Sequence, residues 1–153
     1  MEKSDIRYST YIRILKEELV PAMGCTEPIA IAYCAARTRD LLGGLPDSCL
    51  VEASGNIIKN VKSVVVPNAD GLRGIEAAAA AGIVAGDASR VLEVISEVTP
   101  EQKQQIRDFL SKVPFTVRPA EKAELLDIRV TLTRGNDTAC VRIAGYHTNI
   151  VYM

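Results

Sequence analysis

The segment PAMGCTEP, residues 21–28, places a cysteine in a loop directly before an apolar run. Cys25 follows a glycine and precedes Thr26 and Glu27. A helix that begins between residues 26 and 28 would put the thiol beside unpaired backbone N–H groups, which favour a reactive thiolate. Glu27 would then be a competing negative charge or a general acid–base group. The alternative is that Cys25 is a small apolar plug and Glu27 a simple cap, and these residues alone leave both open.

A second polar cluster follows the apolar run CLVEA, residues 49–53, which predicts a short strand. The cluster is SGNIIKN, residues 54–60, and its polar members are Ser54, Asn56, Lys59 and Asn60. Their hydroxyl, amide and ammonium groups suit a carboxylate or an amino-acid ligand. The composition by itself favours the simpler interpretation, a polar turn between two strands, because such residues dominate turns.

The single histidine of the chain lies in GYHTN, residues 145–149. His147 is accompanied by Thr148 and Asn149 on or near a terminal strand. A lone histidine is more often structural than catalytic, but imidazole is the side chain best suited to proton transfer near neutral pH.

The remaining thiols lie in apolar or strand contexts and are predicted to be core residues; they are Cys34, Cys49 and Cys140. No two cysteines form a CxxC pair, and the spacing does not indicate a zinc site.

Hydrophobic periodicity and capping signals predict the elements that must position these residues. Helices are expected over residues 5–20, from 26–28 to Gly43, over 69–86, over 87–98 and over 99–113. The last of these carries a capping box, with Thr99 as cap and Gln102 at the third position. Strands are expected over 49–53 and 61–68, and a hairpin turns at residues 135–137. This order predicts a single α+β domain over residues 1–153, with helices packed on a mostly antiparallel sheet.

Composition excludes several classes of protein. The chain has 153 residues, 48% hydrophobic and 24% charged, which is typical of a globular domain. The formal net charge is −1 and there is no basic run, so neither a nucleic-acid nor a membrane partner is expected. The charged N-terminus does not resemble a signal peptide, and four unpaired cysteines are typical of a reducing compartment. A cytoplasmic location is therefore expected.

Three separated motifs together resemble a known family. They are VPAMGCTEPIAIAYCAA, SGNIIKNVKSVVVPNADGLRGIEAAAAAG and HTNIV, in that order. They resemble the L-cysteine desulfidase family, which is also catalogued as the UPF0597 type and is related to the alpha-chain domain of iron–sulfur L-serine dehydratases. The resemblance covers essentially the whole chain.

The resemblance implies an oxygen-labile [4Fe-4S] cluster, no pyridoxal phosphate, and β-elimination of L-cysteine to pyruvate, ammonia and sulfide. Cys25 matches the cysteine regarded as catalytic in the family, either as a base or as a sulfur-transfer thiol, and Glu27 is the second catalytic candidate. The substrate-binding candidates that it implies are Thr26, Ser54, Asn56, Lys59, Asn60, His147 and Asn149.

The resemblance also implies that the cluster and the substrate are bound by different parts of the protein. Family members are longer, and their cluster-binding cysteines lie in a C-terminal part. Three thiolates are needed to hold a [4Fe-4S] cluster with an open iron, and Cys34, Cys49 and Cys140 do not match those positions. The chain is therefore expected to be an N-terminal region that binds no cluster and is inactive alone. Its expected partners are a small amino-acid substrate and either the C-terminal remainder or further copies of itself.

Two alternatives stay open at this point. The same machinery can expel hydroxide, which would make the protein an L-serine dehydratase-type lyase. The chain can also be a cluster-free binding or interaction module that lacks the elimination chemistry.

Overall fold

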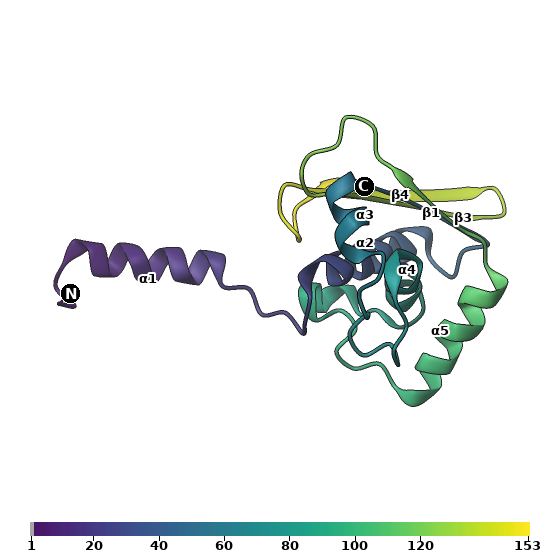
Figure 1. Cartoon of the computed structure of the whole chain (residues 1–153), viewed down its shortest axis with the longest axis horizontal. Helices are drawn as coiled ribbons and strands as arrows, with labels where there is room; N and C mark the ends of the chain where they lie inside the picture. The colour runs from purple at the N-terminus through teal and green to yellow at the C-terminus, as the bar shows by residue number, and fades with distance from the viewer. Residues whose placement is uncertain (1) are drawn as a thin grey trace.

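A computed structural model describes residues 2–153 and shows a five-stranded sheet with helices packed on one side (Figure 1). The helices are α1 (Ile6–Glu18), α2 (Thr26–Leu42), α3 (Gly55–Val61), α4 (Gly74–Ala85), the 3-10 helix η1 (Ala88–Glu93) and α5 (Pro100–Lys112). The strands are β1 (Ser48–Ala53), β2 (Phe115–Pro119), β3 (Asp127–Arg134), β4 (Asp137–Ala144) and β5 (Ile150–Tyr152).

The sheet has the strand order β2-β1-β3-β4-β5. Only the β1–β2 pair is parallel, because the chain passes through α3, α4, η1 and α5 between these two strands. The other pairs are antiparallel, which confirms the predicted α+β fold with a mostly antiparallel sheet. Burial alternates along β1, so Cys49 and Val51 face the helices while Leu50 and Glu52 lie on the opposite, open face.

The predicted hairpin is confirmed between β3 and β4. Gly135 adopts a φ of +56° at its two-residue turn, a conformation that glycine adopts without strain. The Asp47 carboxylate accepts a hydrogen bond from the Gly135 N–H at 2.7 Å and so fixes the turn to the segment before β1.

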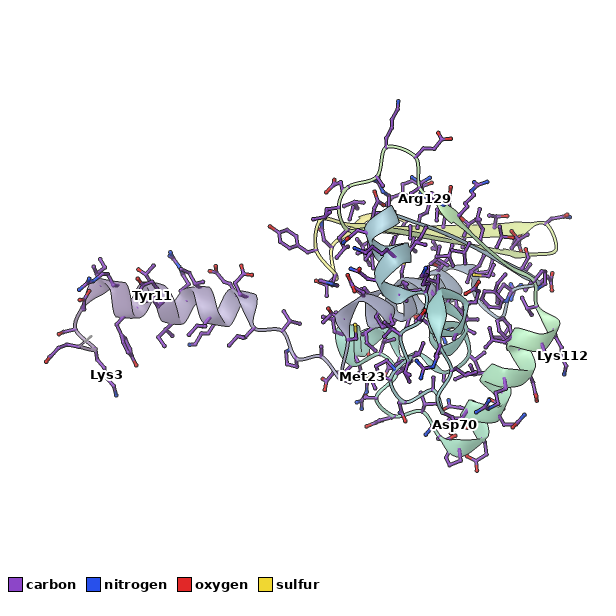
Figure 2. All side chains as sticks on the ribbon, viewed as in Figure 1. Lys3, Tyr11, Met23, Asp70, Lys112 and Arg129 are labelled. Carbon is purple, nitrogen blue, oxygen red and sulfur yellow. The ribbon has the colours of Figure 1, made fainter. Side chains whose placement is uncertain are left out.

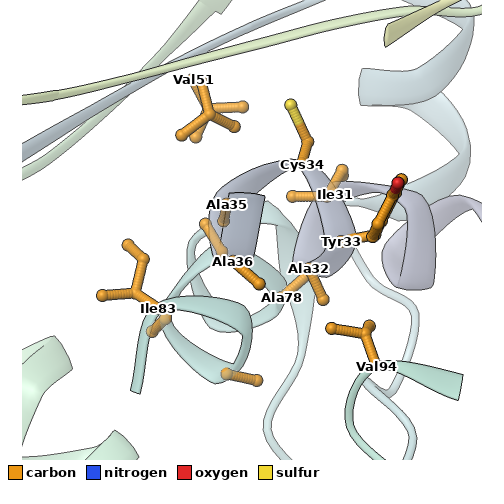
Figure 3. Packing of buried hydrophobic residues seen from close by; sticks show 14 of the residues in the cluster. Ile31, Ala32, Tyr33, Cys34, Ala35, Ala36, Val51, Ala78, Ile83 and Val94 are labelled. Carbon is orange, nitrogen blue, oxygen red and sulfur yellow. The ribbon is translucent and has the colours of Figure 1, made fainter. Parts of the chain in front are cut away.

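Helix α2 forms the centre of the core, where it packs between the sheet and α4 (Figure 3). Its Cys34 thiol points at the sheet and donates to the Val141 carbonyl at 3.3 Å. Burial raises the pKa of Cys34, and burial also raises the pKa of Cys49 to about 12. Both are core thiols, as predicted. The prediction was wrong for Cys140, which alternates onto the open face and is half-buried there.

Helices α2 and α4 approach each other unusually closely at Gly82. A Cβ atom added to Gly82 would lie 2.0 Å from the Ala32 carbonyl oxygen. The run of five alanines, residues 77–81, is buried beside it. The alanine-rich helix is therefore the narrow buried rod that its composition predicts.

The region between β1 and α4 differs from its prediction. The predicted polar turn is instead the helix α3 (Gly55–Val61), which Ser54 caps and whose Ile57 and Val61 share one buried face. The strand predicted over 61–68 is absent from the described chain, where Val65 and Arg73 make only an isolated bridge. Of the apolar residues after Asn60, Val61 instead ends α3, and Val61 and Val66 are buried in the core.

The helix predicted from residue 69 begins later. Asn68 and Asp70 adopt positive φ values of 55° and 54°, so residues 67–73 form a loop and Arg73 takes the cap position of α4. The helix predicted over 87–98 is shorter and less regular than expected, since Val91 has a non-helical φ of 53° inside η1. The capping box of α5 is confirmed in both of its hydrogen bonds.

Helix α1 projects away from the rest of the molecule, with Tyr11 on it (Figure 2). None of its residues is buried. Along the described residues, every helix is too short or too polar to cross a lipid bilayer.

Candidate active site at the start of helix α2

The start of α2 has an unusual cap. Cys25 occupies the N-cap position, its side chain makes no capping hydrogen bond, and it is exposed. The helix begins at Thr26, within the predicted range, and Cys25 takes the cap position that the simpler interpretation gave to Glu27. The first backbone N–H groups of α2 therefore lack a side-chain acceptor from the cap residue, and a thiol stands beside them.

Thr26 meets the histidine of the last motif. The Thr26 hydroxyl and the His147 Nε2 lie 3.2 Å apart, a hydrogen bond in which the tautomer decides which group donates. His147 is carried by the loop between β4 and β5. Asn149 closes this loop, because its side-chain amide donates to the Ala144 carbonyl at 2.8 Å while its own carbonyl accepts from the Ala144 N–H at 3.1 Å. Asn149 thus fixes the loop that carries His147, while substrate binding by Asn149 stays a prediction.

Glu27 meets the second motif. The Asn60 side-chain amide donates to the Glu27 carboxylate at 2.9 Å. Asn60 lies at the end of α3, on a polar face that also carries Asn56 and Lys59, and all three are exposed. Because Ile57 and Val61 point into the core, this polar face looks outward beside the start of α2.

Ser54 lies apart from this cluster, at the opposite end of α3. It is buried, accepts a hydrogen bond from the Ile57 N–H at 3.3 Å, and donates one to the Leu125 carbonyl at 2.8 Å. The structure thus gives Ser54 a capping and tethering role, while substrate binding by Ser54 stays a prediction.

Gly24 has a packing reason to be glycine. An added Cβ would lie 2.8 Å from Pro67 Cγ, so the glycine lets the loop before α2 pass close to the loop before α4.

A cleft of about 420 Å³ opens beside Thr26 and His147. Its other lining residues are Glu17, Glu18, Val20, Leu92, Tyr146 and Thr148. Sequence reasoning placed Thr148 beside the histidine but gave no role to Leu92 or Tyr146. Leu92 reaches the cleft from η1. No local pattern in the sequence predicts a contact between residues so far apart along the chain.

The cysteines of this chain do not fit a [4Fe-4S] cluster. Cys34 and Cys49 are buried on the helix side of the sheet, Cys140 is on the open side, and Cys25 lies at the start of α2. Within residues 2–153 no three His, Cys, Asp or Glu side chains gather in a way that could hold a metal ion. A cluster of this kind needs three convergent thiolates.

The fold and the site define a small α+β domain that presents polar side chains from three sequence motifs around the start of one helix. Homologues at 44–56% identity carry the UPF0597 family name. These similarities support membership of that family and no specific function. A UPF0597 protein of Desulfitobacterium hafniense is 56% identical over all 153 residues. UPF0597 proteins of Treponema denticola and Fusobacterium nucleatum are 46% and 48% identical over 147 and 139 residues.

The chain spans about a third of the length of these relatives, namely 36%, 34% and 33%. The three matches include 100%, 96% and 91% of this chain. No family model matches the chain. No solved structure matches it either.

Proposed function

We propose that this chain is the N-terminal, substrate-facing region of an iron–sulfur-dependent lyase that eliminates sulfide from L-cysteine. The observation that carries the proposal is the meeting of three motifs at the start of α2. Cys25 caps the helix without a hydrogen bond, Thr26 bonds to His147, and Glu27 bonds to Asn60. Each motif belongs to the resemblance with the L-cysteine desulfidase family, so the fold brings together residues that the sequence holds far apart.

The chemistry assigned to these residues is a β-elimination. L-cysteine and one water yield pyruvate, ammonia and hydrogen sulfide. The unpaired N–H groups of α2 suit the substrate carboxylate, since a helix start attracts anions. In this proposal the Cys25 thiolate accepts the Cα proton, and the C–S bond then breaks with its electron pair leaving on sulfur. Water hydrolyses the aminoacrylate that remains.

The neighbouring residues orient this reaction. Asn60 holds the Glu27 carboxylate beside the helix start, where that carboxylate suits the substrate ammonium group. The Thr26–His147 pair holds the imidazole at the edge of the cleft. The cysteines of this chain do not fit a [4Fe-4S] cluster, so in this proposal its ligands lie in polypeptide outside the 153 residues, and no step above passes through it.

The test is a chimera in which this chain replaces the matched segment of the Desulfitobacterium relative. In the chimera, Cys25→Ser is expected to lower kcat for L-cysteine about 10²–10⁴-fold, the usual contribution of a general base, because serine stays protonated near neutral pH. Iron content and turnover are measured on the same sample. L-serine is assayed in parallel, because elimination of hydroxide is the competing reaction.

The matched control is Cys140→Ser, the same substitution at a half-buried thiol on the far side of the sheet. It is expected to keep both iron and turnover. An active Cys25→Ser chimera would return this thiol to a structural role. A chimera that loses its iron with Cys25→Ser would make Cys25 a ligand, and either result overturns the role proposed here.

A further inference from the structure

The open face of the sheet carries one row of charged cross-strand neighbours. Strand pairing places Arg118 of β2 opposite Glu52 of β1, Glu52 opposite Arg129 of β3, and Arg129 opposite Arg142 of β4. Tyr152 of β5 ends the row beside Arg142. Three of these five side chains are guanidinium groups, and two of them are direct cross-strand partners. Like charges in that relation destabilise a sheet.

The two strand carboxylates on this face, Glu52 and Asp127, already accept hydrogen bonds from arginines. One oxygen of Glu52 accepts from Nε and Nη2 of Arg118 at 3.1 and 3.0 Å. Asp127, which is only 2% exposed, accepts from Nε and Nη2 of Arg142 at 2.9 and 2.6 Å in a two-pronged pair. The Glu124 backbone N–H also donates to Asp127 at 3.1 Å. Each of the two carboxylates therefore already accepts two hydrogen bonds from an arginine other than Arg129.

Arg129 is the arginine of this row that donates no hydrogen bond to a carboxylate and makes only a long ion pair, with the second oxygen of Glu52. Its nearest carboxylate oxygen, on Glu52, is 3.8 Å away, which is too long for a hydrogen bond. Across residues 2–153 its guanidinium donates no hydrogen bond, and it is partly exposed. On the strands of this face three arginines stand against two carboxylates, Glu52 and Asp127. Arg129 (labelled in Figure 2) therefore presents a fork of N–H donors at the middle of the face.

The same residues line hollows in this face. Two cavities of about 460 and 590 Å³ share Glu52, Arg118, Arg129 and Arg142. The loop after β2 adds one charge of each sign, Glu121 and Lys122, to the first, and β5 adds Val151 and Tyr152 to the second. Tyr152 and Val151 are exposed. The second cavity thus combines the Arg129 guanidinium, whose N–H groups make no hydrogen bond in the described chain, with an apolar wall.

We propose that this face is a binding site for a small organic anion, whose phosphate or carboxylate head group binds the Arg129 guanidinium and whose apolar part lies against Val151 and Tyr152. An arginine fork matches both head groups with paired N–H···O bonds. The bound anion would also relieve the repulsion between Arg129 and Arg142. The site is on the side of the sheet away from α2, so it does not depend on the elimination chemistry proposed above.

The experiment titrates the 153-residue chain with phenyl phosphate and, separately, with benzoate and inorganic phosphate. Sodium chloride keeps the ionic strength constant, because screening alone changes surface electrostatics. The readouts are the melting temperature and backbone amide chemical shifts. Saturable shifts are expected in β3, β4 and β5, with phenyl phosphate binding more tightly than inorganic phosphate. Comparison of phenyl phosphate with benzoate identifies the preferred head group.

Arg129→Gln is expected to weaken binding at least about tenfold, in line with the loss of charge-assisted hydrogen bonds. Its melting temperature without ligand is expected to be equal to or above that of the parent, because a like-charge pair has been removed. Arg13→Gln makes the same charge change on α1 and is expected to bind like the parent. The proposal is overturned by non-saturable shifts, by equal binding to the parent and Arg129→Gln, or by shifts that map outside the open face. A lower melting temperature with unchanged ligand response would show that Arg129 serves only Glu52.

Discussion

Helices α1 and α2 are neighbours in sequence but rely on opposite sources of stability. Asp5 caps α1 and accepts a hydrogen bond from the Arg7 N–H at 2.9 Å, yet no residue of α1 is buried. Cys25 caps α2 without any side-chain hydrogen bond, yet most of α2 is buried. A short helix without packing is marginal in water, whereas a packed helix draws its stability from burial. Burial thus allows α2 to do without a good cap, and the cap position is free to hold a reactive side chain.

The largest effect should separate these two helices directly. Ile31 of α2 is 0% exposed and Leu15 of α1 is 49% exposed. Ile31→Ala should lower the free energy of unfolding by about 2–5 kcal/mol, because it leaves a cavity in the core. Leu15→Ala should change it by less than about 0.5 kcal/mol, as is usual for exposed positions. Urea denaturation of both variants measures the contrast, and equal losses would show that α1 is packed in solution.

A somewhat smaller effect tests the close approach of α2 and α4. Gly82→Ala should cost about 1–3 kcal/mol or more, the usual range for overpacking, because the added methyl meets the Ala32 backbone. Gly55→Ala is the matched control, since its added methyl meets nothing within 4 Å. That control should be neutral or slightly stabilising. A tolerated Gly82→Ala would mean that the two helices lie farther apart.

The pH dependence should be smaller and confined to acid. Burial opposes ionisation of Asp127, but hydrogen bonds from Arg142 and the Glu124 N–H outweigh it and lower the pKa of this carboxyl. A carboxyl whose folded pKa is depressed stabilises the fold above its unfolded pKa of about 3.9 and loses that contribution as pH falls through the folded value. Unfolding by urea should therefore become easier below about pH 4. Asp127→Asn should flatten this part of the profile, and an unchanged acid limb would assign it to other carboxylates.

The elements that sequence reasoning predicted well are those fixed by local signals. The capping box of α5, the Gly135 turn and the start of α2 each depend on residues within a few positions of one another. The prediction was wrong for residues 54–68, because a short apolar run fits a strand and a buried helix equally well. In the structure the Ser54 cap favours the helix.

The site could be predicted only in part for the same reason. The residues of the α2 start were identified from their types, but the two hydrogen bonds that join them cross 33 and 121 positions of sequence. Which partner each residue meets depends on how α3 and the β4–β5 loop pack against α2. Likewise, Cys140 was assigned to the core because its apolar neighbours do not reveal which face of β4 it occupies.

Thiol alkylation tests whether the start of α2 makes Cys25 more reactive, as the proposed function requires. Iodoacetamide modification at pH 7 is followed at each cysteine by peptide mass mapping, in the folded chain and in urea. Cys25 is expected to react several-fold faster in the folded chain than in the unfolded one, because it is exposed beside the unpaired N–H groups of the helix start, which attract negative charge. Cys34, Cys49 and Cys140 should all react more slowly when folded. A Cys25 that reacts no faster in the folded chain than in urea would contradict the claim and leave it a structural residue at a turn.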